Sequence, residues 1–348
     1  MKMKSLMRPA FVLSCALAVR TAAASDATIW TVGEPDGRPD GFALAPDGFR
    51  DFLARDFGYE DKFYLVGHSD PSTDFPYVLP GPADTWGGTW PTSGWRTHEV
   101  NILFGLDEQP DDDCLLAVDL ADYAKRFPPL VKVSVNGQDA WFRLNDPDDP
   151  TAAGRRYGQQ EPTVDTLSLT GRFERATPRR LEMPLRRGTL RKGGNTVHVT
   201  VLEGSWILFD RVALEGPSSV RPTQSEGLFV RDVAAAPYES DHDGKRVQPL
   251  LVDVEWLGAT PTLSVEIDGR ELFNRRVEAG RSRFEVPMPA VRRARTSCYR
   301  VLCDGREVAS GCIERAPRPE QTLADYVDTR IGTAHSRWMI APGPWMPF

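Results

Sequence analysis

Hydrophobic and polar residues alternate along two short runs of this chain. In Leu130–Val135 and in Thr196–Val201, valine occupies every second position, and polar residues fill most of the positions between. Successive side chains of a β-strand point to opposite faces of its sheet, so each run predicts a strand with one buried and one wetter face. The first run ends at Asn136-Gly137, which suits a tight hairpin because both residues tolerate positive φ.

Short β-prone runs of this kind recur from residue 27 to residue 216, and clusters of Gly, Pro, Asp and Asn separate them. Asn101–Phe104 and Leu115–Val118 are further examples. Many short strands with frequent turn residues are typical of a β-sandwich or a jelly roll. We therefore expect an all-β protein with few helices, whose first module spans residues 27–216.

A second, smaller module is predicted over residues 222–315. Proline and serine in Pro217–Pro222 interrupt the strand pattern and indicate a linker. Beyond the linker, runs such as Leu250–Trp256 follow at close intervals, and Asp-Gly pairs stand where turns are needed. This spacing favours an immunoglobulin-like sandwich. Pro317-Arg318-Pro319 then indicates another boundary, so residues 320–348 are expected to begin a third unit.

The charge balance argues against a nucleic-acid partner. The formal net charge is -7 at pH 7, whereas binding to phosphates needs concentrated lysine and arginine. The nearest approach to a basic patch is formed by Arg179-Arg180, Arg186-Arg187 and Arg191-Lys192, and acidic residues elsewhere outweigh it. Hydrophobic residues make up 41% of the chain, which is typical of an ordinary soluble globular protein.

Residues 1–24 are typical of an export signal peptide. Two lysines and an arginine within the first eight residues precede an apolar run, and Ala22-Ala23-Ala24 offers a cleavage site of small residues. We expect a secreted or periplasmic protein. Val12-Leu13-Ser14-Cys15 faintly resembles a lipoprotein box, which makes lipid anchoring the alternative. No later run reaches the ~20 apolar residues that a membrane-spanning helix needs, so no transmembrane segment is predicted.

Four cysteines follow the signal peptide, and three of them cluster around a predicted hairpin at Asp304-Gly305. In an oxidising compartment such cysteines can pair. If the turn holds three residues, Cys298 faces Cys312; if it holds two, side-chain alternation places them on opposite faces. The pairing among Cys298, Cys303 and Cys312 stays open at this point. The cysteine and histidine spacing matches no zinc site.

The first module resembles a known family at several motifs. These motifs are the stretch from Trp30 to Gly37 with Phe42, the run Val100–Phe104, the Val-x-Val-Asn-Gly of 133–137, and the closing Gly194–Val197 and Phe209–Glu215. Together they are similar to the carbohydrate-binding-like jelly-roll domain of rhamnogalacturonan lyases. The likeness covers nearly all of residues 27–216. It implies a galactose-binding-like jelly roll and an association with sugar, without implying cleavage, because that domain is an accessory one.

The last residues carry a second resemblance. Asp325–Thr333 and the Pro-Gly to Pro-Phe ending make residues 322–348 similar to the start of glycoside hydrolase family 92, which comprises calcium-dependent exo-acting α-mannosidases. The likeness implies that the chain is an N-terminal portion of such an enzyme and that Ca²⁺ is a cofactor of the parent. The family's acid, base and calcium ligands lie mostly downstream, so no catalytic residue and no metal ligand is assigned here.

Three tryptophans form the candidate binding site for a glycan. Trp86, Trp90 and Trp95 lie within ten residues of one another among glycines and prolines, which predicts a loop. Indole faces stack on the C–H faces of pyranose rings, and the indole N–H bonds a hydroxyl. The alternative is that these rings plug one end of the sandwich. A buried position is expected for the tryptophans in or beside β-prone runs. These are Trp30, Trp141, Trp206 and Trp256.

Acidic clusters offer weaker candidates. Asp111–Asp113 and Asn145–Asp149 supply oxygen ligands of the kind that Ca²⁺ prefers, but neither follows the EF-hand spacing, and solvated turns are the favoured explanation. His68 with Asp70, and His98 with Glu99, are general bases only in principle, and loop hydrogen bonds are the plainer explanation. The chain is therefore expected to be a non-catalytic, carbohydrate-associated region. The alternative is a structural or interaction protein that binds no glycan.

Overall fold

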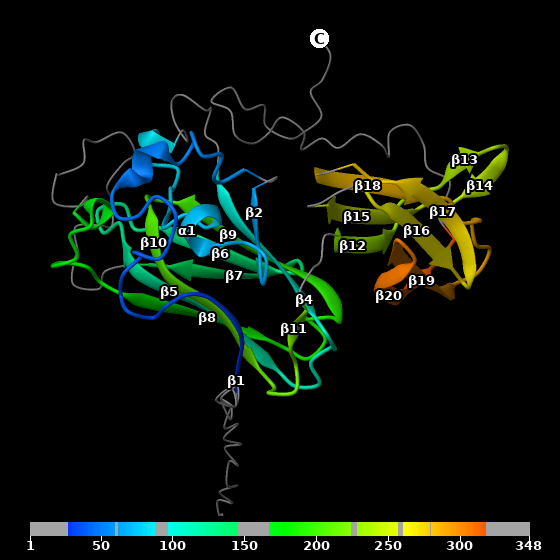
Figure 1. Ribbon diagram of the computed structural model, residues 1–348, viewed down its shortest axis with the longest axis horizontal. Helices are drawn as coiled ribbons and strands as arrows, with labels where there is room; N and C mark the ends of the chain where they lie inside the picture. The colour runs from blue at the N-terminus through cyan, green and yellow to red at the C-terminus, as the bar shows by residue number, and fades with distance from the viewer. Residues whose placement is uncertain are drawn as a thin grey trace, which may run out of the picture.

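The computed structural model describes residues 27–59, 62–87, 97–144, 167–223, 228–256, 260–278 and 280–317. The predicted signal peptide and residues 320–348 lie outside these ranges. Strands in two modules make up nearly all of the regular secondary structure in the described part, which confirms the all-β prediction (Figure 1). Its helices are single short turns. They are η1 (Gly48–Asp51), α1 (Pro71–Asp74), η2 (Thr85–Gly87) and η4 (Ser168–Thr170).

The first module consists of two sheets, as a jelly roll requires. One sheet has the strand order β1-β10-β5-β8, with β3 added beside β10. Its strands are β1 (Ala27–Gly33), β3 (Val78–Leu79), β5 (Cys114–Tyr123), β8 (Arg179–Leu185) and β10 (Ile207–Gly216). The other has the order β11-β4-β9-β6-β7, with β2 added beside β4. Its strands are β2 (Phe63–Leu65), β4 (Glu99–Leu106), β6 (Leu130–Val135), β7 (Gln138–Arg143), β9 (Gly193–Glu203) and β11 (Pro222–Thr223).

The alternating valines of β6 and β9 are buried in the space between these two sheets, as their pattern predicts. The strands β6 and β7 are joined at Asn136-Gly137, where both residues have positive φ, 49° and 84°. The predicted hairpin is therefore confirmed. The Asn136 amide also donates from Nδ2 to the carbonyl oxygen of Thr189 at 2.9 Å, which ties the turn to the chain that enters β9.

The core of the first module is rich in aromatic rings. Phe75 is fully buried, and its ring centroid lies 5.0 Å from that of Phe42, 5.7 Å from that of Tyr64 and 5.0 Å from that of Phe209. Tilted and edge-on ring pairs at such distances are favourable beyond their area burial. The predicted core positions of Trp30 and Trp206 in this module, and of Trp256 in the second, are confirmed.

The second module is also a two-sheet sandwich (Figure 1). The three-stranded sheet β12-β15-β18 faces the four-stranded sheet β17-β16-β19-β20, a division that matches an immunoglobulin-like fold. The strands are β12 (Leu228–Ala235), β15 (Leu250–Trp256), β16 (Thr262–Ile267), β17 (Arg270–Arg276), β18 (Gly280–Val286), β19 (Arg295–Cys303) and β20 (Arg306–Arg315), with a small hairpin of β13 (Ser240–His242) and β14 (Lys245–Val247).

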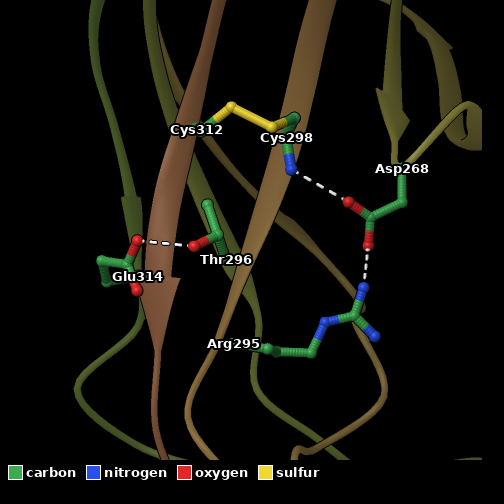
Figure 2. Close-up of a disulfide and its surroundings, with 6 residues drawn as sticks. All are labelled: Asp268, Arg295, Thr296, Cys298, Cys312 and Glu314. Atoms are coloured by element: carbon green, nitrogen blue, oxygen red, sulfur yellow. Dashed lines mark hydrogen bonds and ion pairs between the residues drawn. A yellow bond between two sulfur atoms is a disulfide. The ribbon is translucent and has the colours of Figure 1, made fainter.

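A disulfide joins Cys298 on β19 to Cys312 on β20 (Figure 2). The turn between the strands holds two residues, Asp304-Gly305, which alone would place the two cysteines on opposite faces. However, the register shifts between Val301 and Leu302, so β20 carries one extra residue. This bulge restores the parity and brings Cys298 directly opposite Cys312. The sequence could not resolve the alternative because it does not reveal the bulge.

The two modules are in contact through β9 and β12. Phe229 of β12 packs with Leu65 and Leu103 of the first module. Arg191 donates from Nη2 to the carbonyl oxygen of Arg231 at 3.0 Å. Gly194 allows this approach, because a Cβ at that position would lie 2.0 Å from the carbonyl oxygen of Val230. The contact therefore depends on backbone and apolar groups as well as on charge.

Candidate functional site

The outer face of the sheet β11-β4-β9-β6-β7 carries polar side chains that the strand register places in rows. Lys132 of β6 lies opposite Trp141 of β7 on one side and Thr200 of β9 on the other. In the next row, Ser134 lies opposite Asp139 and His198. We call this surface the polar sheet face. It comprises Glu99, Asn101, Lys132, Asp139, Trp141, Arg143, His198 and Glu203.

Trp141 is the most exposed large hydrophobic side chain of the described residues, with 58% of its surface accessible. The prediction that it lies in the core is therefore wrong. On β7, Ala140 and Phe142 face the core, so the residues on either side of them must face outward. The alternation of Asp139, Trp141 and Arg143 with two apolar residues was the signal in the sequence that could have revealed this.

Beside the indole ring, Lys132 and Asp139 form an ion pair, with 3.1 Å between Nζ and Oδ2. Burial alone would raise the pKa of Asp139, but hydrogen bonds from Ser134 and Lys132 outweigh it and hold that pKa below its ordinary value. The carboxylate is thus charged at neutral pH. A second pair, Arg143 with Glu203, extends the face, with 2.6 Å between Nη2 and Oε2.

Three further side chains on β4 and β9 form a hydrogen-bonded group. The Asn101 amide donates from Nδ2 to the carbonyl oxygens of Tyr59 and Lys62, so its Oδ1 is left to accept. His198 Nδ1 lies 2.6 Å from that oxygen and must carry the proton. The same nitrogen is 3.6 Å from Glu99 Oε1, and this histidine holds the pKa of Glu99 below its ordinary value.

The polar sheet face has the chemistry that a sugar requires. An exposed indole offers a flat apolar surface for the C–H face of a pyranose ring. Lys132 supplies donors and Asp139 supplies acceptors at its edge, and each sugar hydroxyl needs both kinds of partner. Because the charges are paired, the face suits a neutral ligand better than a charged one.

The structure describes one of the three tryptophans predicted to bind a glycan. Trp86 lies in η2, half-buried, and its ring packs edge-on against Phe49 at a centroid distance of 5.0 Å and against Phe52 at 6.5 Å. Trp90 and Trp95 lie outside the described residues. The packing of Trp86 agrees with the alternative that these rings fill one end of the sandwich. Sugar binding by the three tryptophans stays a prediction.

The paired acid and base candidates are not brought together. His98 is buried, with Nε2 2.6 Å from the carbonyl oxygen of Gly87, whereas Glu99 points to the polar sheet face. Asp70 caps α1 by accepting from the backbone N–H and hydroxyl of Ser72, contacts that lower its pKa. His68 is exposed on the preceding turn.

Asp111–Asp113 form a turn in which Asp113 accepts at 2.8 Å from the backbone N–H of Arg187. Asn145–Asp149 lie outside the described residues. Among the residues that the structure describes, no three His, Cys, Asp or Glu side chains are grouped so as to hold a metal ion. None of the helices in the described ranges is long and apolar enough to cross a bilayer.

Comparison with known proteins agrees with the first module's architecture. The family model described as CBM-like, polysaccharide lyase family 4, domain III, matches residues 28–214. No match is found among curated proteins.

Solved structures with local similarity include a GH2 β-galacturonidase from Eisenbergiella tayi, with 10% identity over 62% of this chain and 34% of that chain and a TM-score of 0.22. Another is a β-D-mannosidase from Dictyoglomus thermophilum, with 9% identity over 59% and 27% of the two chains and a TM-score of 0.23. This chain thus spans about a third of the length of the first.

Proposed function

This chain belongs to the CBM-like family of polysaccharide lyase family 4, domain III, and on that premise we propose that it is a non-catalytic region that binds a glycan on its polar sheet face. One observation carries the proposal: Trp141, 58% exposed on an otherwise polar sheet, lies directly opposite Lys132 and its ion pair with Asp139. The exposed indole and the donors and acceptors beside it together supply the two kinds of contact that a sugar needs.

The arrangement of the partners suggests how a sugar is held. One face of a pyranose ring stacks on Trp141, while hydroxyls at the ring edge accept from Lys132 and donate to Asp139. Both side chains are fixed by their mutual ion pair before the ligand arrives, which lowers the entropy lost on binding. Arg143 and Glu203 offer the same combination to a neighbouring sugar unit.

Tryptophan fluorescence and calorimetry with neutral pectic and mannose-rich oligosaccharides test the proposal. Trp141→Ala should weaken binding at least tenfold, a loss of ~1.4 kcal/mol. Arg186→Ala is the control, because Arg186 is an exposed residue of the first module that lies outside the polar sheet face. Trp90→Ala distinguishes binding at the predicted tryptophan loop from binding at the polar sheet face, because it alters only the loop.

If the wild-type chain binds none of these glycans, the alternative of a structural or interaction protein replaces the proposal. If Trp90→Ala abolishes binding while Trp141→Ala leaves it intact, the loop is the platform and the polar sheet face is not.

We also propose that the protein is exported and that it serves a larger glycoside hydrolase of the α-mannosidase type. Export is supported by residues 1–24 and by the Cys298–Cys312 disulfide, since such bonds persist in oxidising compartments. The enzyme type depends only on the resemblance in residues 322–348. An assay for Ca²⁺-dependent α-mannosidase activity on the longest product of the gene tests it, and cleavage of another linkage only would refute it.

A further inference from the structure

The second module contains a hollow of about 700 Å³ beside the turn between β16 and β17 and the segment that enters β19. We call it the basic pocket, because arginines dominate its charged lining. These charged residues are Arg270, Arg292, Arg293, Arg295, Arg315 and a single acid, Asp268. The volume lies within the range of small-molecule sites, about 300–1,000 Å³. Such a concentration of positive charge is unexpected in a chain with a net charge of -7.

The one acid in the lining is already engaged. Asp268 pairs with Arg295, with 2.6 Å between Oδ2 and Nη2, and its other oxygen accepts from the backbone N–H of Cys298 (Figure 2). Within the described residues, Arg270, Arg292 and Arg293 have no carboxylate partner. The pocket therefore holds a surplus of exposed positive charge.

Arg315 is the most informative member, because it is only 4% exposed. Its guanidinium donates to Gln248 Oε1 at 3.4 Å, to Ser297 Oγ at 3.3 Å and to the carbonyl oxygen of Pro289. All three acceptors are neutral, and a guanidinium has five N–H donors, so two remain. Burial and the neighbouring charge of Arg295 both lower the pKa of Arg315. The charges of Asp268 and Glu239 act in the opposite direction but are outweighed. A buried guanidinium whose hydrogen-bond acceptors are all neutral is costly, and a bound anion would offset that cost.

We propose that the basic pocket is a binding site for the carboxylate group of an acidic saccharide. The planar fork of arginine matches a carboxylate in bidentate geometry, and several exposed arginines around a buried one define an orientation for it. That the ligand is an anion follows from the pocket alone. That it is a saccharide rests on the proposed function.

A saccharide fits better than a nucleic acid. The apolar part of the lining is aliphatic, including Leu272 and Met288, and the described lining has no aromatic ring on which a base could stack. The excess of acidic residues elsewhere in the chain would repel a long polyanion. A short oligouronide, which presents one carboxylate to the pocket, avoids that repulsion.

Calorimetry on the whole chain with a galacturonate trisaccharide and its methyl ester is the test. The free acid should bind at least tenfold more tightly than the ester, and less tightly as salt is raised. Arg292→Gln with Arg293→Gln should weaken binding of the acid at least tenfold. The matched control is Arg186→Gln with Arg187→Gln, another adjacent exposed pair with the same change in charge, in the first module.

Arg315→Lys keeps the positive charge but loses the planar guanidinium, and a folded variant should bind the acid at least tenfold more weakly. If this variant does not fold, the double variant of the exposed Arg292 and Arg293 still tests the proposal. Equal affinity for acid and ester, or equal losses in both double variants, would overturn the proposal. Tighter binding of an oligodeoxynucleotide than of the trisaccharide would also overturn it. Trp141→Ala should not change the tenfold preference for the acid over its ester. A loss of this preference would therefore refute the basic pocket alone, and a failure of glycan binding on the polar sheet face would refute the proposed function alone.

Discussion

The two modules of this chain are both β-sandwiches, yet they are stabilised by different interactions. The largest fully buried side chains, among them Trp206, Tyr77 and Phe75, all belong to the first module. The core of the second module is smaller and mostly aliphatic, built from residues such as Val252, Val254 and Leu263. Small domains bury a lower fraction of their surface than large ones, so the second module needs additional stabilisation.

That stabilisation comes from the disulfide and from ion pairs between neighbouring strands. Asp253 on β15 bonds to both Arg281 and Arg283 on β18, at 2.9 and 3.0 Å. Arg231 on β12 forms a buried pair with Glu255. The first module also has ion pairs between strands, such as Lys132 with Asp139, but buried aromatic rings dominate its core, whereas aliphatic side chains dominate that of the second module. The difference predicts that the modules respond to different perturbations.

The largest effect is expected from a cavity in the aromatic core. Phe75→Ala removes a fully buried ring that contacts Phe42, Tyr64 and Phe209. It should destabilise the first module by about 3–5 kcal/mol. Scanning calorimetry should show the corresponding transition at a lower temperature, while the transition of the second module stays nearly in place.

Leu272→Ala is the control, since an exposed side chain contributes within about 0.5 kcal/mol. A single transition that shifts as a whole in the Phe75→Ala variant would contradict the separation of the modules. It would show instead that the contact of Phe229 with Leu65 and Leu103 makes them unfold together.

A smaller effect, confined to the second module, is expected from loss of the disulfide. Cys298 and Cys312 are 14 residues apart, and closing a loop of about 15 residues is worth ~3 kcal/mol in the chain-entropy account. Cys298→Ser with Cys312→Ser should lower only the second transition in a thermal scan. Cys303→Ser, which alters a free cysteine of the same module, is the control. Equal shifts in both variants would show that the bond contributes no stability of its own.

The sequence predicted the parts of this fold that depend on local alternation. Valine at every second position of β6 and β9, and Asn-Gly between β6 and β7, identify strands and a hairpin from neighbouring residues alone. The same rule was enough to place Trp141 outward, but the size and apolar character of the side chain outweighed it in the prediction.

Features that depend on distant residues could not be predicted. The bulge in β20 decides which cysteines meet, and it is visible only in the register of β20 against β19. The basic pocket gathers Arg270, Arg292 and Arg315 from three separate segments. By contrast, the fold partly neutralises the pair Arg179-Arg180, which the sequence marked as part of a basic patch: Arg180 bonds to Asp119, Glu182 and Glu215. Charge clusters in a sequence and charge clusters on a surface are therefore different things.

The smallest of the expected effects is a difference in acid sensitivity at Asp253. Burial alone would raise the pKa of Asp253, but hydrogen bonds from Arg281 and Arg283 outweigh it and hold the pKa below its ordinary value. A carboxyl group with a lowered pKa stabilises the fold above its unfolded pKa, about 3.9, and this contribution is lost as the pH falls through the folded pKa.

Asp253→Asn should therefore cost ~1.5 kcal/mol at pH 7 and progressively less below pH 4, where the wild type loses the same contribution. Chemical unfolding of the second module from pH 7 to pH 2.5 measures this. Burial, and in smaller part the charge of Asp253, raises the pKa of the neighbouring Glu255, which gives the opposite pH dependence. Because Asp253→Asn removes that part, the comparison is repeated in a Glu255→Gln background, where Glu255 contributes to neither protein. A stability difference that stays constant over this range would mean that Asp253 acts through packing and not through its charge, and charge would then not distinguish the second module from the first at this position.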